Sequence, residues 1–373
     1  MLMNDTFVIV DNHQWIKNDP FEGYYITYLE VPNGSTAGPV QVLPNRLVTV
    51  NVTPDSGFVL DYLIVNGQII EGNSFIMPFN DVIIDAVFKL TTPATLRFKF
   101  YDTSYVPSSD SGAEWQSNIT WTRVTSSPNV WDCALTLSSS ILDAFDFYGN
   151  KFRNAGEYEI LGGNTEGLRE WYNTFVDCVG LKKINQLTLH SDLNMTFQAC
   201  SGLTDARLDM GSEVRSLHDG FLYCRTLSNI TVNNTDDVVD MSGLFNGCYA
   251  IVEAPELETS SVTTVDGMFF SCSGMVDMPT YNTSNVVDMS FMLDGCESLK
   301  HIPLFDTANV TNVSHMCFLT RDSEGGQLAL YNQLISQTNP PTSYDSCFYQ
   351  CGLNSTTGSA ETAQIPDSWK QYS

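Results

Sequence analysis

The sequence predicts a mainly β protein, in which a small N-terminal β domain precedes a capped solenoid of short parallel strands and short helical or 3₁₀ turns. A repeat of 24 residues runs through the middle of the chain, and residues 48–90 alternate between apolar and polar side chains in the strand period. The predicted domains are an N-terminal β domain (1–92), the N-terminal cap of the solenoid (93–166), the solenoid (167–319), and an insertion with the C-terminal cap (320–373).

Cysteine marks the repeat. Five cysteines follow one another at intervals of 24 residues, and a sixth precedes them by 22. Phenylalanine, or leucine in the last unit, stands three residues before each cysteine, and an apolar residue stands three after. So many phased positions indicate stacked coils, because a single coil cannot bury its own apolar face. The repeating cysteines are Cys178, Cys200, Cys224, Cys248, Cys272 and Cys296.

Each repeat is expected to hold a strand, a turn and a corner. Leu299–Phe305 reads as extended, so we expect it and its counterparts to stack as parallel strands about 4.8 Å apart. Pro303 fits such a strand if its missing donor lies at the strand end. Val286–Leu293 spaces its apolar residues as a short helical or 3₁₀ turn does. Thr283 begins a corner whose side chains can bond backbone groups.

The repeating cysteines are predicted to be free, buried thiols, because small apolar side chains suit a position that recurs inside every coil. Disulfides and a zinc site are the alternatives. The nearest approach to a zinc-ligand pair is Cys347 with Cys351, four residues apart rather than three.

The motif Met-x-x-Met-Phe-x-x-Cys-x-x-Leu resembles the BspA-like family of surface leucine-rich repeats. It is carried by Met241–Cys248, Val265–Cys272 and Thr283–Cys296, with a degraded copy at Thr307–Leu319, and the resemblance covers about 168–319. It implies a leucine-rich-repeat-like solenoid that binds and displays, as in bacterial surface adhesins and in similar chains of gut bacteriophages. It implies no enzyme activity and identifies no ligand.

The sequence departs from the family pattern after Met316. Cys317 stands where phenylalanine belongs, and Arg321–Tyr344 intervenes before the next motif ends at Cys351. We expect the inserted segment to form part of the C-terminal cap; the alternative is a helix and loop that project from the solenoid.

The N-terminal region has strand patterns at Val48–Val52, Tyr62–Val65 and Val82–Phe88, separated by turn residues such as Asn66-Gly67. This pattern resembles the divergent internalin-type B-repeat over about 22–91. The resemblance implies a small β domain that serves as a spacer or attachment module on surface proteins.

Charge and motifs exclude several functions. With 17 basic and 43 acidic residues the net charge is −26, which repels nucleic acid. No apolar run is long enough for a membrane span, so no membrane insertion is expected. The histidines show no metal-ligand spacing and no glycine-rich phosphate loop follows a strand, so we predict no catalytic, cofactor or metal residues. The carboxylates that a polysaccharide-cleaving spike would require, a minor alternative, are Asp236, Asp237, Asp240, Glu256 and Glu258.

A binding face is the preferred site hypothesis. The two residues after each conserved apolar position vary between coils and are expected to point outward, where they contact a partner or form an ordinary solvated face. These residues are Val252, Glu253, Val276, Asp277, Lys300 and His301.

These inferences favour a non-enzymatic protein on the surface of a bacteriophage virion, in which the β domain attaches to other virion proteins and the solenoid contacts a host-surface protein or glycan. Residues 1–24 lack the basic start and apolar run of a secretory signal, which favours a virion over the alternative, a bacterial cell-surface adhesin. A homo-oligomer is compatible with this role. A virion protein assembles in a reducing cytoplasm, so its cysteines are expected to be reduced.

Overall fold

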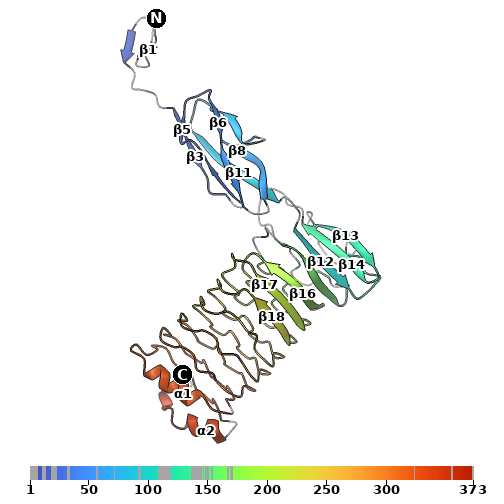
Figure 1. Ribbon diagram of the computed structural model, residues 1–373, viewed down its shortest axis with the longest axis vertical. Coiled ribbons are helices and arrows are strands. Elements are labelled where there is room, and N and C mark those ends of the chain that lie inside the picture. The colour runs from blue at the N-terminus through green and yellow to red at the C-terminus, as the bar shows by residue number, and fades with distance from the viewer. Residues whose placement is uncertain are drawn as a thin grey trace. The chain divides into compact units, whose positions relative to one another are not determined.

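The predicted fold class is confirmed: the protein is mainly β, with an N-terminal β region and a solenoid of stacked coils (Figure 1). The structure is a computed structural model that describes residues 7–10, 14–17, 23–31, 34–55, 58–70, 72–90, 94–107, 119–135, 145, 147, 151–152, 154–165, 168, 171–322, 324–353 and 356–371. These residues divide into two compact units, one up to residue 90 and one from residue 94.

The first unit has a five-stranded sheet in the order β5-β3-β11-β8-β9, in which β11 runs parallel to β3 and antiparallel to β8. Three two-stranded antiparallel ladders, β1-β2, β4-β7 and β6-β10, complete it. Asn66 and Gly67 both have positive φ in the tight turn between β8 and β9, as the sequence pattern predicted. The strands are β1 (Phe7–Val10), β2 (Gln14–Lys17), β3 (Tyr24–Tyr28), β4 (Gly34–Ala37), β5 (Gln41–Val42), β6 (Leu47–Thr49), β7 (Asn51–Pro54), β8 (Phe58–Val65), β9 (Gln68–Ile70), β10 (Ser74–Ile76) and β11 (Val82–Leu90).

The second unit begins with a seven-stranded sheet in the order β13-β14-β12-β15-β16-β17-β18. Its first four strands pair antiparallel, and from β15 onward the pairing is parallel, so the sheet passes directly into the first coils of the solenoid. Phe98, Phe147, Phe152 and Tyr158 pack beneath the antiparallel part. The strands are β12 (Ala94–Phe100), β13 (Ile119–Ser126), β14 (Asn129–Leu135), β15 (Tyr158–Asn164), β16 (Leu181–Leu189), β17 (Asp205–Met210) and β18 (Asn229–Asn233).

The parallel strands end at β18, so the prediction of a strand at Leu299–Phe305 was wrong. In the later coils, the segments that correspond to β17 and β18 keep a single bridge, between Glu253 and Asp277. The physical reason is proline, which lacks the N–H that a ladder requires. Seven residues after the cysteine, the coils that form β17 and β18 have Arg207 and Thr231, whereas the later coils have Pro255, Pro279 and Pro303.

The segment before each cysteine forms consecutive turns closed by hydrogen bonds between residues three apart. In the coil of Cys296, Met292 N–H donates to Met289 C=O at 3.3 Å and Cys296 N–H to Leu293 C=O at 3.1 Å. The bonding is the i to i+3 kind expected at Val286–Leu293, but Phe291 has φ 55° and prevents a continuous 3₁₀ helix. Alternate N–H groups point to the next coil: Phe245 N–H, for example, donates to Met268 C=O at 2.9 Å.

All ten cysteines are free and buried, and the repeating ones form the predicted ladder. Each of the six repeating thiols also has a partner, because its Sγ donates to a phenylalanine carbonyl of the preceding coil, as Cys272 does to Phe245 at 3.1 Å. In the coil of Cys317, Thr320 takes the cysteine position and its Oγ1 donates to Leu293 C=O at 2.8 Å. Beside the thiols, the rings of Phe147, Phe175, Phe197, Phe221, Phe245 and Phe269 stack with centroids 5.1–5.9 Å apart.

The last coils are covered by two helices, α1 (Gln327–Ile335) and α2 (Thr356–Thr362), and by the 3₁₀ helix η2 (Asp367–Trp369). Helix α1 arises from the inserted segment and buries Leu330 and Leu334. Gln327 Nε2 donates to Gly358 C=O at 2.8 Å and so joins α1 to α2. Phe348 N–H, which has no further coil to pair with, donates instead to Trp369 C=O at 3.0 Å.

Candidate functional site

The predicted binding face lies on one side of consecutive coils, where the residues four and five positions after the cysteine follow one another. Val276 N–H donates to Val252 C=O at 2.8 Å, and Lys300 N–H donates to Val276 C=O at 3.1 Å, so the first row is held together by backbone bonds. Five of the six predicted side chains are exposed and Val276 is half-buried. The ring of His301 lies against the Gly325 carbonyl.

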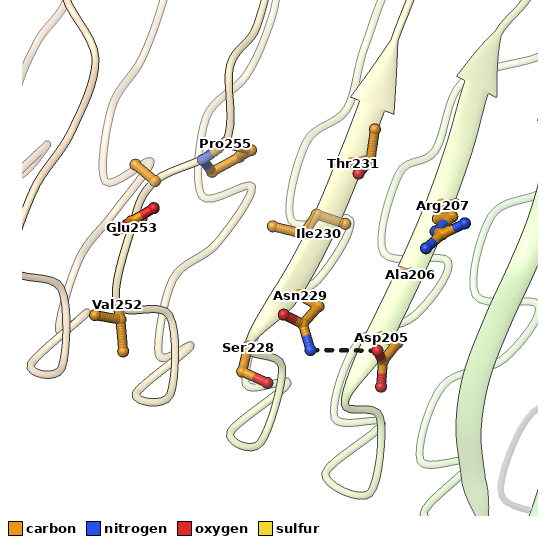
Figure 2. Close-up of a pocket in the computed structure, with 11 residues that line it drawn as sticks. Asp205, Ala206, Arg207, Ser228, Asn229, Ile230, Thr231, Val252, Glu253 and Pro255 are labelled. Atoms are coloured by element: carbon orange, nitrogen blue, oxygen red, sulfur yellow. Dashed lines mark hydrogen bonds between the residues drawn. The ribbon is translucent and has the colours of Figure 1, made fainter.

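A groove of about 660 Å³ opens on this face and falls within the range of roughly 300–1,000 Å³ typical of ligand sites. Figure 2 shows it between β18 and the coil that carries Val252 and Glu253. Of the six predicted residues only these two line it, whereas Val276, Asp277, Lys300 and His301 lie outside. The lining residues are Asp205, Ala206, Arg207, Ser228, Asn229, Ile230, Thr231, Val252, Glu253, Ala254 and Pro255.

Sequence reasoning missed Asp205, Arg207, Asn229 and Thr231, which β17 and β18 contribute to the groove. A signal for them was present. Asp205 and Asn229 stand five residues after their cysteines, as Glu253 does, so they extend the predicted row toward the N-terminus.

The polar groups of the groove differ in how far they are already engaged. Asp205 accepts hydrogen bonds from Asn229 Nδ2 at 3.2 Å (Figure 2) and from Thr204 Oγ1 at 2.6 Å, and its carboxylate lies 3.6 Å from Lys183 Nζ. Arg207 and Glu253 are exposed and form no ion pair with another described residue. The groove therefore presents one basic and one acidic side chain to a ligand.

The backbone ladder is interrupted at this groove. Asn229 N–H donates to Thr204 C=O at 3.1 Å, so Asn229 directs its backbone groups toward β17. Ile230, which lines the groove, and Val232, which lies just beyond the lining, direct theirs toward the following coil. Within the described stretch 229–257, no backbone hydrogen bond joins β18 to the following coil. That coil is bonded to its other neighbour, through Ala254 N–H to Asp277 C=O at 3.1 Å.

The coils rejoin on both sides of the gap. Before it, Tyr223 N–H donates to Asn246 C=O at 2.7 Å. After it, Thr235 Oγ1 donates to Glu258 C=O at 2.9 Å. The groove is therefore a local opening between two coils that remain stacked at both corners.

The carboxylates considered for hydrolysis occupy structural positions or the solvated surface. Asp240 Oδ1 accepts the Ser242 N–H at 2.8 Å in a turn, and Asp237 lies 4.0 Å from Arg215. Among the described residues no group of three histidine, cysteine or acidic side chains is placed to hold a metal ion. The arrangement of the groove suits non-covalent recognition.

Two family models match the repeat region. Residues 171–251 match the BspA-type leucine-rich repeat region, and residues 215–325 match a family described as Mycoplasma protein of unknown function, DUF285. No curated protein and no solved structure matches the chain. The repeats recognised in the sequence are thus confirmed as BspA-type; repeats of this type suggest a surface or binding protein, and their solenoid is typically a non-enzymatic scaffold. No helix among the described residues is both long and apolar enough to cross a membrane.

Proposed function

We propose that this protein is a non-enzymatic binding protein on the surface of a bacteriophage virion, whose coils contact a host-surface protein or glycan. The observation that carries the proposal is the row of polar side chains, exposed except for the half-buried Asp205, that crosses five coils and borders the groove. The row consists of Asp205, Asn229, Glu253, Asp277 and His301. Variable polar residues on a rigid scaffold are the usual means by which repeat proteins bind partners.

Attachment to the particle is assigned to the N-terminal β unit. Leu47 and Ile76 are opposite each other across the β6-β10 ladder and are 66% and 58% exposed, and Phe79 nearby is 67% exposed. Apolar side chains grouped in this way on a soluble domain favour contact with another protein. The ten free cysteines are in keeping with a chain that folds in a reducing cytoplasm, where virion proteins assemble.

The location is tested by immunogold electron microscopy, with antibody to this chain, on purified phage particles and on uninfected host cells. Gold at defined positions on the particle is the expected result. Gold on uninfected cells alone would replace the virion assignment by the alternative, a bacterial surface adhesin.

The binding face is tested with purified fluorescent protein and host cells. Glu253→Lys, on the groove, is expected to reduce cell binding about tenfold or more, because it reverses the charge of one wall. Asp236→Lys makes the same charge change at an exposed turn outside the groove and is the matched control. Equal binding by the wild type and both variants would show that the groove is not the contact surface.

A further inference from the structure

The strand β18 exposes an unused sheet edge inside the groove. The backbone N–H and C=O groups of Ile230 and Val232 face away from β17 and have no hydrogen-bond partner among the described residues. Nearly all backbone groups of folded proteins are paired with protein or water, and an open strand edge is a ready template for another strand.

The backbone of the following coil does not close this gap. On the opposite wall Pro255 has no N–H to donate, and Ala254 already donates to Asp277 on the following coil. The bridge between Glu253 and Asp277 fixes this wall to the C-terminal side, which leaves the backbone of Glu253 directed toward the groove. Both walls therefore offer backbone groups to a ligand.

We propose that the groove binds an extended polypeptide segment of the partner, which adds to β18 as a further strand. This inference rests on the proposed binding function and specifies the partner as protein rather than glycan. The two backbone groups on each of Ile230 and Val232 match the two-residue repeat of an extended chain. A basic side chain on the segment would meet Glu253, and an acidic one would meet Arg207.

The wall chemistry favours a peptide over a sugar. The backbone of Ile230 and Val232 presents donors and acceptors alternately along a line, which a second strand satisfies in register. No aromatic side chain lines the groove, so it offers no ring face on which a sugar could stack.

The test uses the full chain and one backbone donor. Ile230→Pro removes the N–H that faces the groove and no hydrogen bond to β17, and proline is tolerated on an edge strand when its nitrogen faces outward. Ile230→Ala shortens the same side chain and keeps the N–H, so it is the matched control. The thermal midpoints of both variants are measured first, so that loss of fold is separated from loss of binding.

A display library of random 12-residue peptides is selected on the wild-type protein, and the selected peptides are synthesised for fluorescence anisotropy. Ile230→Pro is expected to weaken their binding about tenfold or more, whereas Ile230→Ala binds within about threefold of the wild type. Alternate residues of an added strand direct their N–H groups toward β18. N-methylation of either the odd-numbered or the even-numbered peptide residues is therefore expected to abolish binding, and N-methylation of the other set is expected to leave binding intact. Hydrogen exchange at Ile230 and Val232 is expected to slow when peptide is bound.

Three results would overturn strand addition: no peptide enriched on the wild type over Ile230→Pro, equal peptide affinity for Ile230→Pro and Ile230→Ala, or binding indifferent to the parity of N-methylation. A glycan array on which the wild type binds and Glu253→Lys does not would replace the peptide by a carbohydrate. In each case, host-cell binding by the wild type that Glu253→Lys reduces would leave the proposed function standing. If Glu253→Lys did not reduce host-cell binding, both the proposed function and strand addition would be overturned.

Discussion

Replacing Cys272 by aspartate tests the thiol ladder directly. The side chain of Cys272 is fully buried, and its Sγ donates to the Phe245 carbonyl at 3.1 Å. Burial raises the pKa of the thiol to about 12, which measures how strongly this site disfavours a negative charge. A carboxylate at the same place would meet the same lack of water and would have no cation nearby to pair with.

The size of the destabilisation follows from the free energy needed to keep the buried aspartate protonated. To stay neutral at pH 7 the aspartate must hold its proton about three units above its ordinary pKa near 4, which costs about 4 kcal/mol. The ionised form in this environment costs more. Because whole domains are stable by roughly 5–15 kcal/mol, Cys272→Asp is expected to unfold a large part of the solenoid or lower its stability severely.

The chain supplies a matched control for this substitution. Thr320 occupies the same position in its own coil, is fully buried, and donates through Oγ1 to Leu293 C=O at 2.8 Å. Cys272→Thr is therefore expected to change stability by no more than about 1 kcal/mol, because the hydroxyl can replace the thiol as donor. Cys272→Ala removes the donor without adding charge and is expected to cost about 1 kcal/mol.

Urea denaturation followed by circular dichroism measures all four proteins, at pH 7 and at pH 4.5. The pKa of the new carboxyl is higher in the folded state than in the unfolded chain. The destabilisation is therefore greatest above the folded-state pKa, and it shrinks as the pH falls toward the unfolded-state pKa. An aspartate variant with the wild-type midpoint at pH 7, or with a deficit that does not depend on pH, would refute the buried ladder.

Three further predictions follow from other contacts. Burial raises the pKa of Asp294 to about 7, and its carboxylate lies 3.7 Å from His315 Nδ1. The stabilising contribution of the protonated carboxyl is complete below about pH 4 and is lost as the pH rises through 7. Asp294→Asn should therefore gain about 2.5 kcal/mol relative to the wild type between pH 5 and pH 8, measured by urea midpoints at both values. Thr283→Val should cost about 1–2 kcal/mol of stability, because Thr283 Oγ1 donates to Asp306 C=O at 2.8 Å. Thr311→Val, at an exposed and longer hydrogen bond, should cost less than about 0.5 kcal/mol. Equal effects of the two substitutions in urea denaturation would contradict a stabilising role for the threonine bonds between coils. The ten thiols should resist iodoacetamide in the native protein and all react in urea without reductant, as mass spectrometry would show; a disulfide ladder along the repeats would contradict this.

The sequence predicted the stacked coils because the residues that pack one coil on the next recur at a fixed spacing. The phenylalanine stack and the thiol ladder are direct consequences of that spacing. The displaced register after Met316 was also readable, since Cys317 takes the phenylalanine position. What the pattern did not reveal is that Thr320 replaces the thiol as donor, because the motif was described as a series of small apolar residues rather than as a series of donors.

The strand at Leu299–Phe305 was predicted wrongly because apolar periodicity was given more weight than the backbone. Extended segments of similar pattern occur in every coil, but only those without proline at the seventh position after cysteine pair as strands. Arg207 and Thr231 have the N–H that this position needs, and Pro303 does not.

The candidate site could be predicted in part. The row containing Glu253 is periodic, so the repeat alone places it on the face of the coils. The groove is not periodic, because it exists at one junction between coils, and a repeat pattern describes what coils share rather than where neighbours differ. Asp205 and Asn229 were within reach of the same rule had it been extended to earlier coils.

The position of the groove follows from a single place in the repeat. The coils with Arg207 and Thr231 at that place form a parallel sheet, and the coils with Pro255 and Pro279 hold together by an isolated bridge. A solenoid with proline in every coil, or in none, would have the same spacing throughout and no interrupted junction. The open edge at Ile230 thus arises where the coils that pair as a parallel sheet meet the coils that have proline, between Thr231 and Pro255. Because stacking on both sides is unaffected, the chain can keep an unpaired edge there without losing the core that supports it.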